Sequence, residues 1–160
     1  MAYRNTNRIN LRFLYDGDRG GVFDLLQNTK VMTHIGPRRA LTDNEVLDWI
    51  NAELVSPSRF VVASNESDEI IGFCGVKKID GVFDFGYFLR EKYWNQGYAT
   101  EACRLALLKL SSIMNIADIE IFIALDNYAS RNVATKLNWL RFADINKNGE
   151  QGHIYKVKLA

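Results

Sequence analysis

Residues 93–102 of this chain read Tyr93-Trp94-Asn95-Gln96-Gly97-Tyr98-Ala99-Thr100-Glu101-Ala102. The small side chains of Gly97 and Ala99 let the backbone approach a ligand closely, at the point where a helical pattern begins. The free N–H groups of a first helical turn and the helix dipole both attract anions, so this turn suits a pyrophosphate. The pattern also suits an ordinary tight turn. It is neither a Walker loop nor a three-glycine dinucleotide fingerprint.

The segments around this turn predict a strand–helix–strand unit. Residues 82–90 alternate as a strand does, residues 97–114 carry apolar side chains at helical steps, and residues 118–125 alternate again. Two neighbouring strands joined through a helix run parallel. We therefore expect one parallel crossover in the sheet.

Elsewhere the pattern is mostly that of hairpins. We expect further strands over residues 10–15, 60–64, 69–78, 139–145 and 154–159. We expect further helices over residues 18–27, 42–54 and 129–137, the second of which opens with a capping box. Gly149 and Gly152 are expected in a polar turn before the last strand. Because no Pro-, Gly- or Ser-rich linker divides the sequence, it predicts one α+β domain over residues 1–160, with a mixed, mostly antiparallel sheet of six or seven strands.

Composition narrows the classes of protein that this chain can belong to. It has 160 residues, 48% of them hydrophobic, and a formal net charge of +1, which are typical of one soluble domain. A near-neutral chain lacks the overall basic character of a nucleic-acid-binding protein, although a local basic patch stays open. Its longest apolar runs are too short to span a bilayer, and its polar N-terminus lacks a signal sequence, so we expect a cytoplasmic protein.

Cysteine and histidine are sparse and widely spaced. Cys74 and Cys103 each lie in an apolar stretch and are expected to be buried thiols. His34 and His153 are too far apart along the chain to form a recognisable metal-binding spacing. The sequence therefore predicts no metal.

Four runs of sequence resemble, in order and separation, the GNAT superfamily of acetyltransferases. They are Gly86–Leu89, Tyr93–Ala102, Asp126–Ser130 and Lys136–Trp139. Within that superfamily the chain is most similar to the subgroup that contains the ribosomal-protein N-terminal acetyltransferases, and the likeness runs nearly end to end. The resemblance implies a GNAT-like sheet in which strands 82–90 and 118–125 are parallel and splayed, flanked by about four helices.

The resemblance also implies that acetyl-coenzyme A binds between these two strands as a co-substrate. The pantetheine arm would pair with the backbone of Phe88, Leu89 and Arg90. The pyrophosphate would lie on the backbone N–H groups of Gln96, Gly97, Tyr98, Ala99 and Thr100. Trp94 stands where the common family loop begins with Arg or Gln, so no side-chain role is carried over to it.

Acetyl transfer to an amine requires removal of a proton. Neutralising an alkyl ammonium group with a pKa of about 10.4 costs about 4–5 kcal/mol at pH 7. Asp84 matches the acidic position that many members of the subgroup use as a general base, directly or through water. An acid that alternates with Phe83 and Phe85 can equally face solvent or pair with a base.

The departing thiolate of coenzyme A also needs a proton or a hydrogen-bond donor. Ser130 matches the serine that is proposed to donate to that sulfur, and Asn127 matches a residue that bonds the pantetheine. Both residues are also good helix caps, and Tyr128 is a backup donor. An oxyanion would be stabilised by a backbone N–H near Phe88 or Leu89.

The sequence defines the acetyl acceptor less well than it defines the acetyl donor, acetyl-coenzyme A. His34 lies in the region where family members build their acceptor pocket, and it either contacts substrate or is simply exposed. Arg38 and Arg39 either recruit an acidic acceptor or are solvated. The resemblance implies direct transfer in a ternary complex, with a protein or peptide N-terminal amine as the leading acceptor. A small amine, such as an antibiotic, a polyamine or an amino acid, is the alternative, as is a non-catalytic acyl-coenzyme A-binding module. A homodimer is left open.

Overall fold

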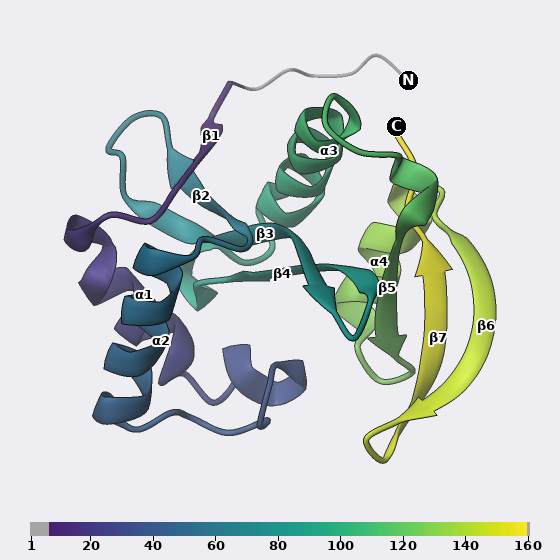
Figure 1. Ribbon diagram of the computed structural model, residues 1–160, viewed down its shortest axis with the longest axis horizontal. Helices are drawn as coiled ribbons and strands as arrows, with labels where there is room; N and C mark the ends of the chain where they lie inside the picture. The colour runs from purple at the N-terminus through teal and green to yellow at the C-terminus, as the bar shows by residue number, and fades with distance from the viewer. Residues whose placement is uncertain (1–6, 160) are drawn as a thin grey trace.

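The computed structural model describes residues 7–159, and within that range it has one seven-stranded sheet with helices on both faces (Figure 1). The strand order is β1-β2-β3-β4-β5-β7-β6. The strands are β1 (Ile9–Arg12), β2 (Phe60–Ser64), β3 (Ile70–Ile79), β4 (Val82–Leu89), β5 (Ile119–Ala124), β6 (Leu140–Lys147) and β7 (Glu150–Lys156). The α-helices are α1 (Arg19–Leu26), α2 (Asp43–Val55), α3 (Tyr98–Ser111) and α4 (Tyr128–Lys136). This architecture confirms the predicted α+β class.

Only one neighbouring pair of strands in this sheet is parallel. β4 and β5 pair through Phe83 with Ile119 and through Asp84 with Glu120, and through no later residue. Beyond Asp84, β4 continues to Leu89 and stays paired with β3 along its opposite edge. The two parallel strands therefore diverge after Asp84, as the course of their ribbons shows (Figure 1).

Two apolar cores fill the two faces of the sheet. Figure 1 shows α1 and α2 together on one side and α3 and α4 on the other. Phe73 and Phe88 belong to the core under α1 and α2, whereas Phe85 and Leu89 belong to the core under α3. Because side chains alternate along a strand, Asp84 lies on the same face of β4 as Phe88. Asp84 thus faces the side of the sheet that α1 and α2 cover.

Two of the local sequence predictions about secondary structure differ from the fold. The last strand runs over Glu150–Lys156 rather than residues 154–159, so Gly152 lies inside β7, opposite Ala124, where a Cβ would meet Ile123 O at 2.4 Å. β1 ends at Arg12 instead of residue 15, because its partner strand β2 begins at Phe60 and the ladder runs out there. The expected capping box of α2 is present, with Thr42 and Glu45 each bonding the backbone of the other.

The structure also bears on the predictions about the two cysteines and about membrane-spanning segments. Cys74 and Cys103 are free and buried, as expected, and burial raises the pKa of the Cys103 thiol. Among residues 7–159, no helix combines the length and apolar character that crossing a bilayer requires. The expectation that the chain has no signal sequence is based on the polar N-terminus. Most of that segment is residues 1–6, which lie outside the residues that the structure describes.

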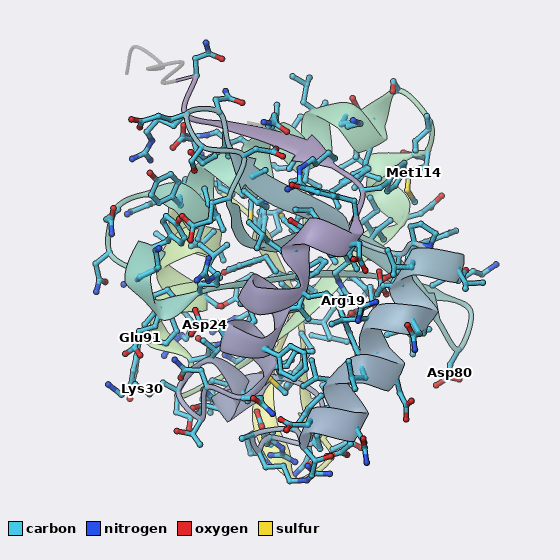
Figure 2. The ribbon with its side chains drawn as sticks, turned by 90° about the vertical axis from the view of Figure 1, so that its left-hand side faces the viewer. Arg19, Asp24, Lys30, Asp80, Glu91 and Met114 are labelled. Atoms are coloured by element: carbon cyan, nitrogen blue, oxygen red, sulfur yellow. The ribbon has the colours of Figure 1, made fainter. Side chains whose placement is uncertain are left out.

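Polar ties hold the segment between β4 and α3 against its neighbours. The Glu69 carboxylate accepts hydrogen bonds from Arg90 at 2.7 Å, Lys92 at 2.9 Å and Tyr93 at 2.8 Å. Lys30 forms an ion pair of 3.0 Å with Glu91, and Figure 2 shows these two side chains next to each other. The approach to residues 93–102 is therefore fixed by several charged contacts.

Replacing Glu69 with glutamine is expected to lower Tm by a few degrees at neutral pH. Lys92, Tyr93 and Arg90 lower the pKa of Glu69 from 4.5 to about 2, so its stabilising contribution is full above about pH 4.5 and falls as the pH drops toward 2. The Tm difference between Glu69→Gln and the wild type should therefore be smaller at pH 3 than at pH 7. Exposed Glu66 in the preceding turn supplies the control Glu66→Gln. An equal difference at both pH values would contradict the proposed role of Glu69.

Candidate active site

The turn before α3 presents an uncapped helix N-terminus. Gly97 has a φ of +83°, a left-handed conformation that favours glycine, and α3 begins at the next residue. No side chain caps this end of the helix. The Gln96 side chain is turned away, since its Nε2 donates to Lys92 O at 2.9 Å. What the turn offers a ligand is therefore mainly backbone N–H groups, and their binding of a pyrophosphate stays a prediction.

Two side chains hold this turn in place, and the sequence predicted neither role. Trp94 Nε1 donates to Leu89 O at 2.9 Å and so ties the turn to the end of β4. Arg8 Nη2 donates to Gln96 O at 3.0 Å, pairs with Glu101, and lies over the Tyr98 ring at 4.0 Å. Arg8 belongs to the segment entering β1, so its contact with the turn depends on the tertiary fold.

The gap between β4 and β5 exposes one edge of β4. The Arg90 N–H donates to Ile71 O at 2.8 Å, toward β3. In an antiparallel ladder every second residue directs its backbone N–H and C=O groups to the same neighbouring strand, so the backbone groups of Phe88 also point to β3. Tyr87 and Leu89 then direct their backbone groups toward the gap. Of the three residues predicted to pair with a pantetheine arm, Leu89 is the one that faces the gap.

A cavity of about 580 Å³ adjoins this gap. Its walls come from α2, from the segment that follows α1, from β3 to β5, from the start of α4 and from the hairpin between β6 and β7. Five of the polar side chains named as candidates in the sequence line it: His34, Arg38, Asp84, Asn127 and Ser130. The fold thus brings together residues that lie almost a hundred positions apart.

Asp84 lies in the cavity wall and is bound to a base. Arg59 Nη2 is 2.8 Å from Asp84 Oδ2, and the two side chains are 17% and 23% exposed. Burial raises the pKa of Asp84, and the positive charges of Arg59 and Lys147 oppose that rise. The carboxylate is therefore more basic than an ordinary aspartate. Ion pairing was one of the two alternatives that the sequence left open.

Ser130 and Asn127 have different partners. Asn127 Oδ1 accepts a hydrogen bond from the Ser130 N–H at 3.3 Å and caps α4, so Asn127 is the cap. The Ser130 hydroxyl accepts one from Tyr87 Oη at 2.9 Å, which leaves its own proton free to be donated. Burial raises the pKa of Tyr87, which stays a neutral donor. Tyr128, the backup donor, is 68% exposed.

His34 is part of a polar cluster at the other end of the cavity. Its Nδ1 lies 3.5 Å from Glu150 Oε2 and its Nε2 lies 3.9 Å from Asp126 Oδ1. These side chains come within reach of one another although they are distant in sequence, so spacing along the chain did not reveal them. Arg38 Nη1 pairs with Glu150 at 2.5 Å and already balances its charge. We therefore assign no metal to this cluster.

The comparison with known families agrees with this geometry. A family model described as the acetyltransferase (GNAT) domain matches residues 8–139. The chain belongs to the GNAT acetyltransferase family. As a GNAT protein it is an acyltransferase, and its divergent parallel strands belong to the GNAT fold. The narrower resemblance to the ribosomal-protein subgroup stays a prediction.

Individual GNAT relatives cover much of this chain. It is 29% identical to the Bacillus subtilis (strain 168) protein YkkB over 161 residues, 96% of this chain and 94% of that protein. An acetyltransferase of the GNAT family from Bacillus anthracis has a similar crystal structure, with a TM-score of 0.78, 24% identity and 92% of each chain covered. Spermidine N-acetyltransferase from Vibrio cholerae, solved with CoA and spermine, has a TM-score of 0.73, 19% identity and 92% of each chain covered.

Proposed function

We propose that this GNAT protein transfers an acetyl group from acetyl-coenzyme A to a primary amine by direct attack in a ternary complex. The observation that carries the proposal is the divergence of β4 and β5 between the uncapped end of α3 and the charged cavity. The free edge of β4 suits a chain of amides, and the N–H groups after Gln96 suit a pyrophosphate. Acetyl-coenzyme A supplies an acetyl group on a good leaving group.

In this proposal the residues of the cavity move two protons. Asp84 takes a proton from the acceptor ammonium, directly or through water, so that the neutral amine can attack the thioester carbon. The carbon–nitrogen bond forms, the carbon–sulfur bond breaks, and the nitrogen loses its second proton to solvent as the amide forms. Ser130 donates a hydrogen bond or its proton to the departing thiolate, and Tyr87 orients the Ser130 hydroxyl by donating to it. A backbone N–H at the gap-facing edge of β4 would stabilise the oxyanion.

The acceptor stays a matter of proposal. The sequence resemblance favoured a protein or peptide N-terminal amine. One observation favours a small amine instead: Arg38 reaches across to the hairpin between β6 and β7, donating to Asn148 O at 2.6 Å and pairing with Glu150. This bridge closes one side of the cavity, so a peptide acceptor would have less room there than a small amine. A homodimer also stays a prediction.

The test of the proposed function is the release of coenzyme A thiol from acetyl-coenzyme A in the presence of small amines and N-terminal peptides. We expect release that depends on one class of acceptor, with an acetylated product of matching mass. A non-catalytic acyl-coenzyme A-binding module would bind the cofactor yet give no release with any amine. That result would overturn the proposed reaction.

The two α4 residues should separate kinetically. Ser130→Ala removes the proposed donor to the thiolate, but a thiol of pKa about 8.5 is a fair leaving group, so we expect kcat to fall only about tenfold. Asn127→Ala removes a predicted pantetheine contact and should mainly raise the KM for acetyl-coenzyme A. Because Asn127 also caps α4, with a cap worth about 1 kcal/mol, thermal unfolding must first show that both variants are folded.

Tyr87→Phe is the companion to Ser130→Ala. It leaves the Ser130 hydroxyl in place but removes the group that orients it. We expect a smaller loss of kcat than in Ser130→Ala, and no additional loss in the double variant. Wild-type kcat in folded Ser130→Ala, with chemistry rate-limiting, would contradict the assignment of Ser130.

A further inference from the structure

The charges that line the cavity have an excess of cations. The cationic side chains are Arg38, Arg59, Lys77 and Lys147, and the carboxylates are Glu53, Asp84 and Glu150. Arg38 pairs with Glu150 and Arg59 pairs with Asp84. Among the described residues, neither Lys77 nor Lys147 forms a salt bridge, and Lys147 lies over the Phe122 ring and acts on Asp84 only through its charge. A polycation would be repelled by such a site, whereas an amine that also carries a negative charge would be attracted.

The Glu53 carboxylate is engaged by the protein and is not free to bind a ligand. It is 7% exposed and accepts hydrogen bonds from the Ser58 hydroxyl at 2.7 Å and the Ser58 N–H at 3.2 Å. These bonds occupy both of its oxygens and hold the residues that lead into Arg59. Glu53 therefore serves to position this segment.

Arg59 is only partly satisfied by the protein. A guanidinium has five N–H groups, and the one side-chain hydrogen bond that Arg59 makes among the described residues runs from Nη2 to Asp84. Its Nε is buried without an acceptor, which is rare in native proteins and indicates that an oxygen partner is missing. The side chain crosses β4 at Gly86, where a Cβ would come within 2.8 Å of Nε. The absence of a side chain at position 86 thus leaves room for the Arg59 guanidinium in the cavity.

The pair formed by Asp84 and Arg59 presents two opposite charges 2.8 Å apart to one ligand. An α-amino acid carries an ammonium and a carboxylate on the same carbon, so it can bind Asp84 and Arg59 at the same time. We propose that the acceptor is an α-amino acid with an apolar side chain, whose ammonium group binds Asp84 and whose carboxylate binds Arg59. This inference rests on the proposed acetyl transfer, because the ammonium at Asp84 is the group to be acetylated.

The apolar part of the cavity receives the side chain of the amino acid. Trp49 packs edge-on against Phe73, with ring centroids 5.0 Å apart, and Phe73 packs against Phe88 at 5.3 Å. All three line the cavity. Phe88 lies on the same face of β4 as Asp84, so the aromatic wall and the ion pair belong to one surface. A charged or strongly polar side chain would lose its hydration there without gaining a partner.

Three matched acceptors test the need for a carboxylate. Leucine has it, leucinamide replaces it with a neutral amide, and 3-methylbutylamine lacks it. We expect kcat/KM for leucine to exceed that for the other two by about 10- to 100-fold, the effect of one hydrogen-bonded charge. Leucinamide is the stringent comparison, because its amine is less basic and more of it is neutral at pH 7. A peptide with N-terminal leucine completes the set.

The variant Arg59→Gln separates recognition from a purely structural role. If Arg59 binds the carboxylate, the preference for leucine over 3-methylbutylamine should fall at least tenfold. If Arg59 only holds Asp84 in place, both acceptors should slow equally and the preference should stay unchanged. Lys78→Gln removes a positive charge from β3 outside the cavity and should leave the preference as it is. Arg59→Lys, which keeps the charge but loses the fork of donors, should give an intermediate preference.

The outcomes distinguish this inference from the proposed function. Equal use of leucine, leucinamide and the peptide would overturn the inference and leave acetyl transfer standing. No transfer to any amine would overturn the proposed function, and calorimetry of leucine with the protein saturated in coenzyme A would then test the part of the inference that concerns binding, namely that Asp84 and Arg59 hold an α-amino acid. Binding of leucine that leucinamide does not match and that Arg59→Gln abolishes would support it. Absence of binding would overturn it.

Discussion

Replacing Gly97 with aspartate is expected to abolish acetyl-coenzyme A binding in a protein that still folds. The turn at Gly97 offers backbone N–H groups to a pyrophosphate, and a carboxylate there would repel that anion. At a separation of about 4 Å such a repulsion is worth about 4 kcal/mol near a protein surface, so we expect affinity to fall at least about 100-fold. Calorimetry with acetyl-coenzyme A measures this loss directly.

The fold should tolerate the change because there is space around Gly97. A Cβ at this position would have Arg8 Nη2 as its nearest neighbour, at 3.6 Å, which is an ordinary contact. Aspartate and asparagine both tolerate a positive φ better than other residues do. Gly97→Asn is therefore the matched control, with the same shape and no charge, and it should bind far more tightly than Gly97→Asp. Unchanged affinity in folded Gly97→Asp would show that the pyrophosphate binds elsewhere.

Local patterns in the sequence predicted much of this fold. The turn at Gly97, the capping box at Thr42 and the alternation of residues 82–90 are each set by neighbours within a few positions. The resemblance to the GNAT family then supplied the order of the elements. What it could not supply was which backbone groups of β4 face the gap. That depends on the register with β3, which places Phe88 opposite Phe73 and Leu89 opposite Gly72.

The contacts that define the site come from long-range packing and were not predictable in the same way. Tyr87 and Ser130 meet only because the fold brings the start of α4 next to β4, 43 positions away in the chain. Arg59 reaches Asp84 across the intervening strand β3, and a glycine at position 86 gives it room. Gly86, two residues after Asp84, is the one local feature of the sequence that relates to this pairing. Its role, to leave space for Arg59, can be recognised only when the positions of the neighbouring strands are known. His34 shows the same limit, because its partners come from β7 and from the end of β5.

Arg59 and Asp84, the ion pair in the cavity wall, should respond differently to mutation. Arg59 would choose among acceptors, whereas Asp84 would act on the amine that all acceptors share. A change at Arg59 should therefore alter the ratio of rates between acceptors, and a change at Asp84 should lower every rate. This contrast makes Asp84 the stronger test of the chemistry.

Asp84→Asn is expected to lower kcat by about 10²–10⁴-fold for every amine while leaving the affinity for acetyl-coenzyme A nearly unchanged. The amide keeps the size of the carboxylate but cannot take a proton. Burial raises the pKa of Asp84 from its ordinary 3.8, so the wild-type rate should fall as the pH drops through that raised value, and this acidic limb should vanish in the variant.

Asp80→Asn is the matched control for this prediction. Asp80 is an exposed residue in the turn between β3 and β4, at the periphery of the molecule in Figure 2, and its positive φ of 50° suits asparagine. The control loses the same charge from the same hairpin, so a general effect of charge would slow both variants alike. If Asp84→Asn turns over at nearly the wild-type rate across the pH range, the carboxylate only balances Arg59 and another group or water removes the proton. A selective loss in Asp84→Asn, with Asp80→Asn unaffected and the acidic limb gone, would tie proton removal to this one carboxylate, because a general effect of charge on the hairpin would be seen in both variants.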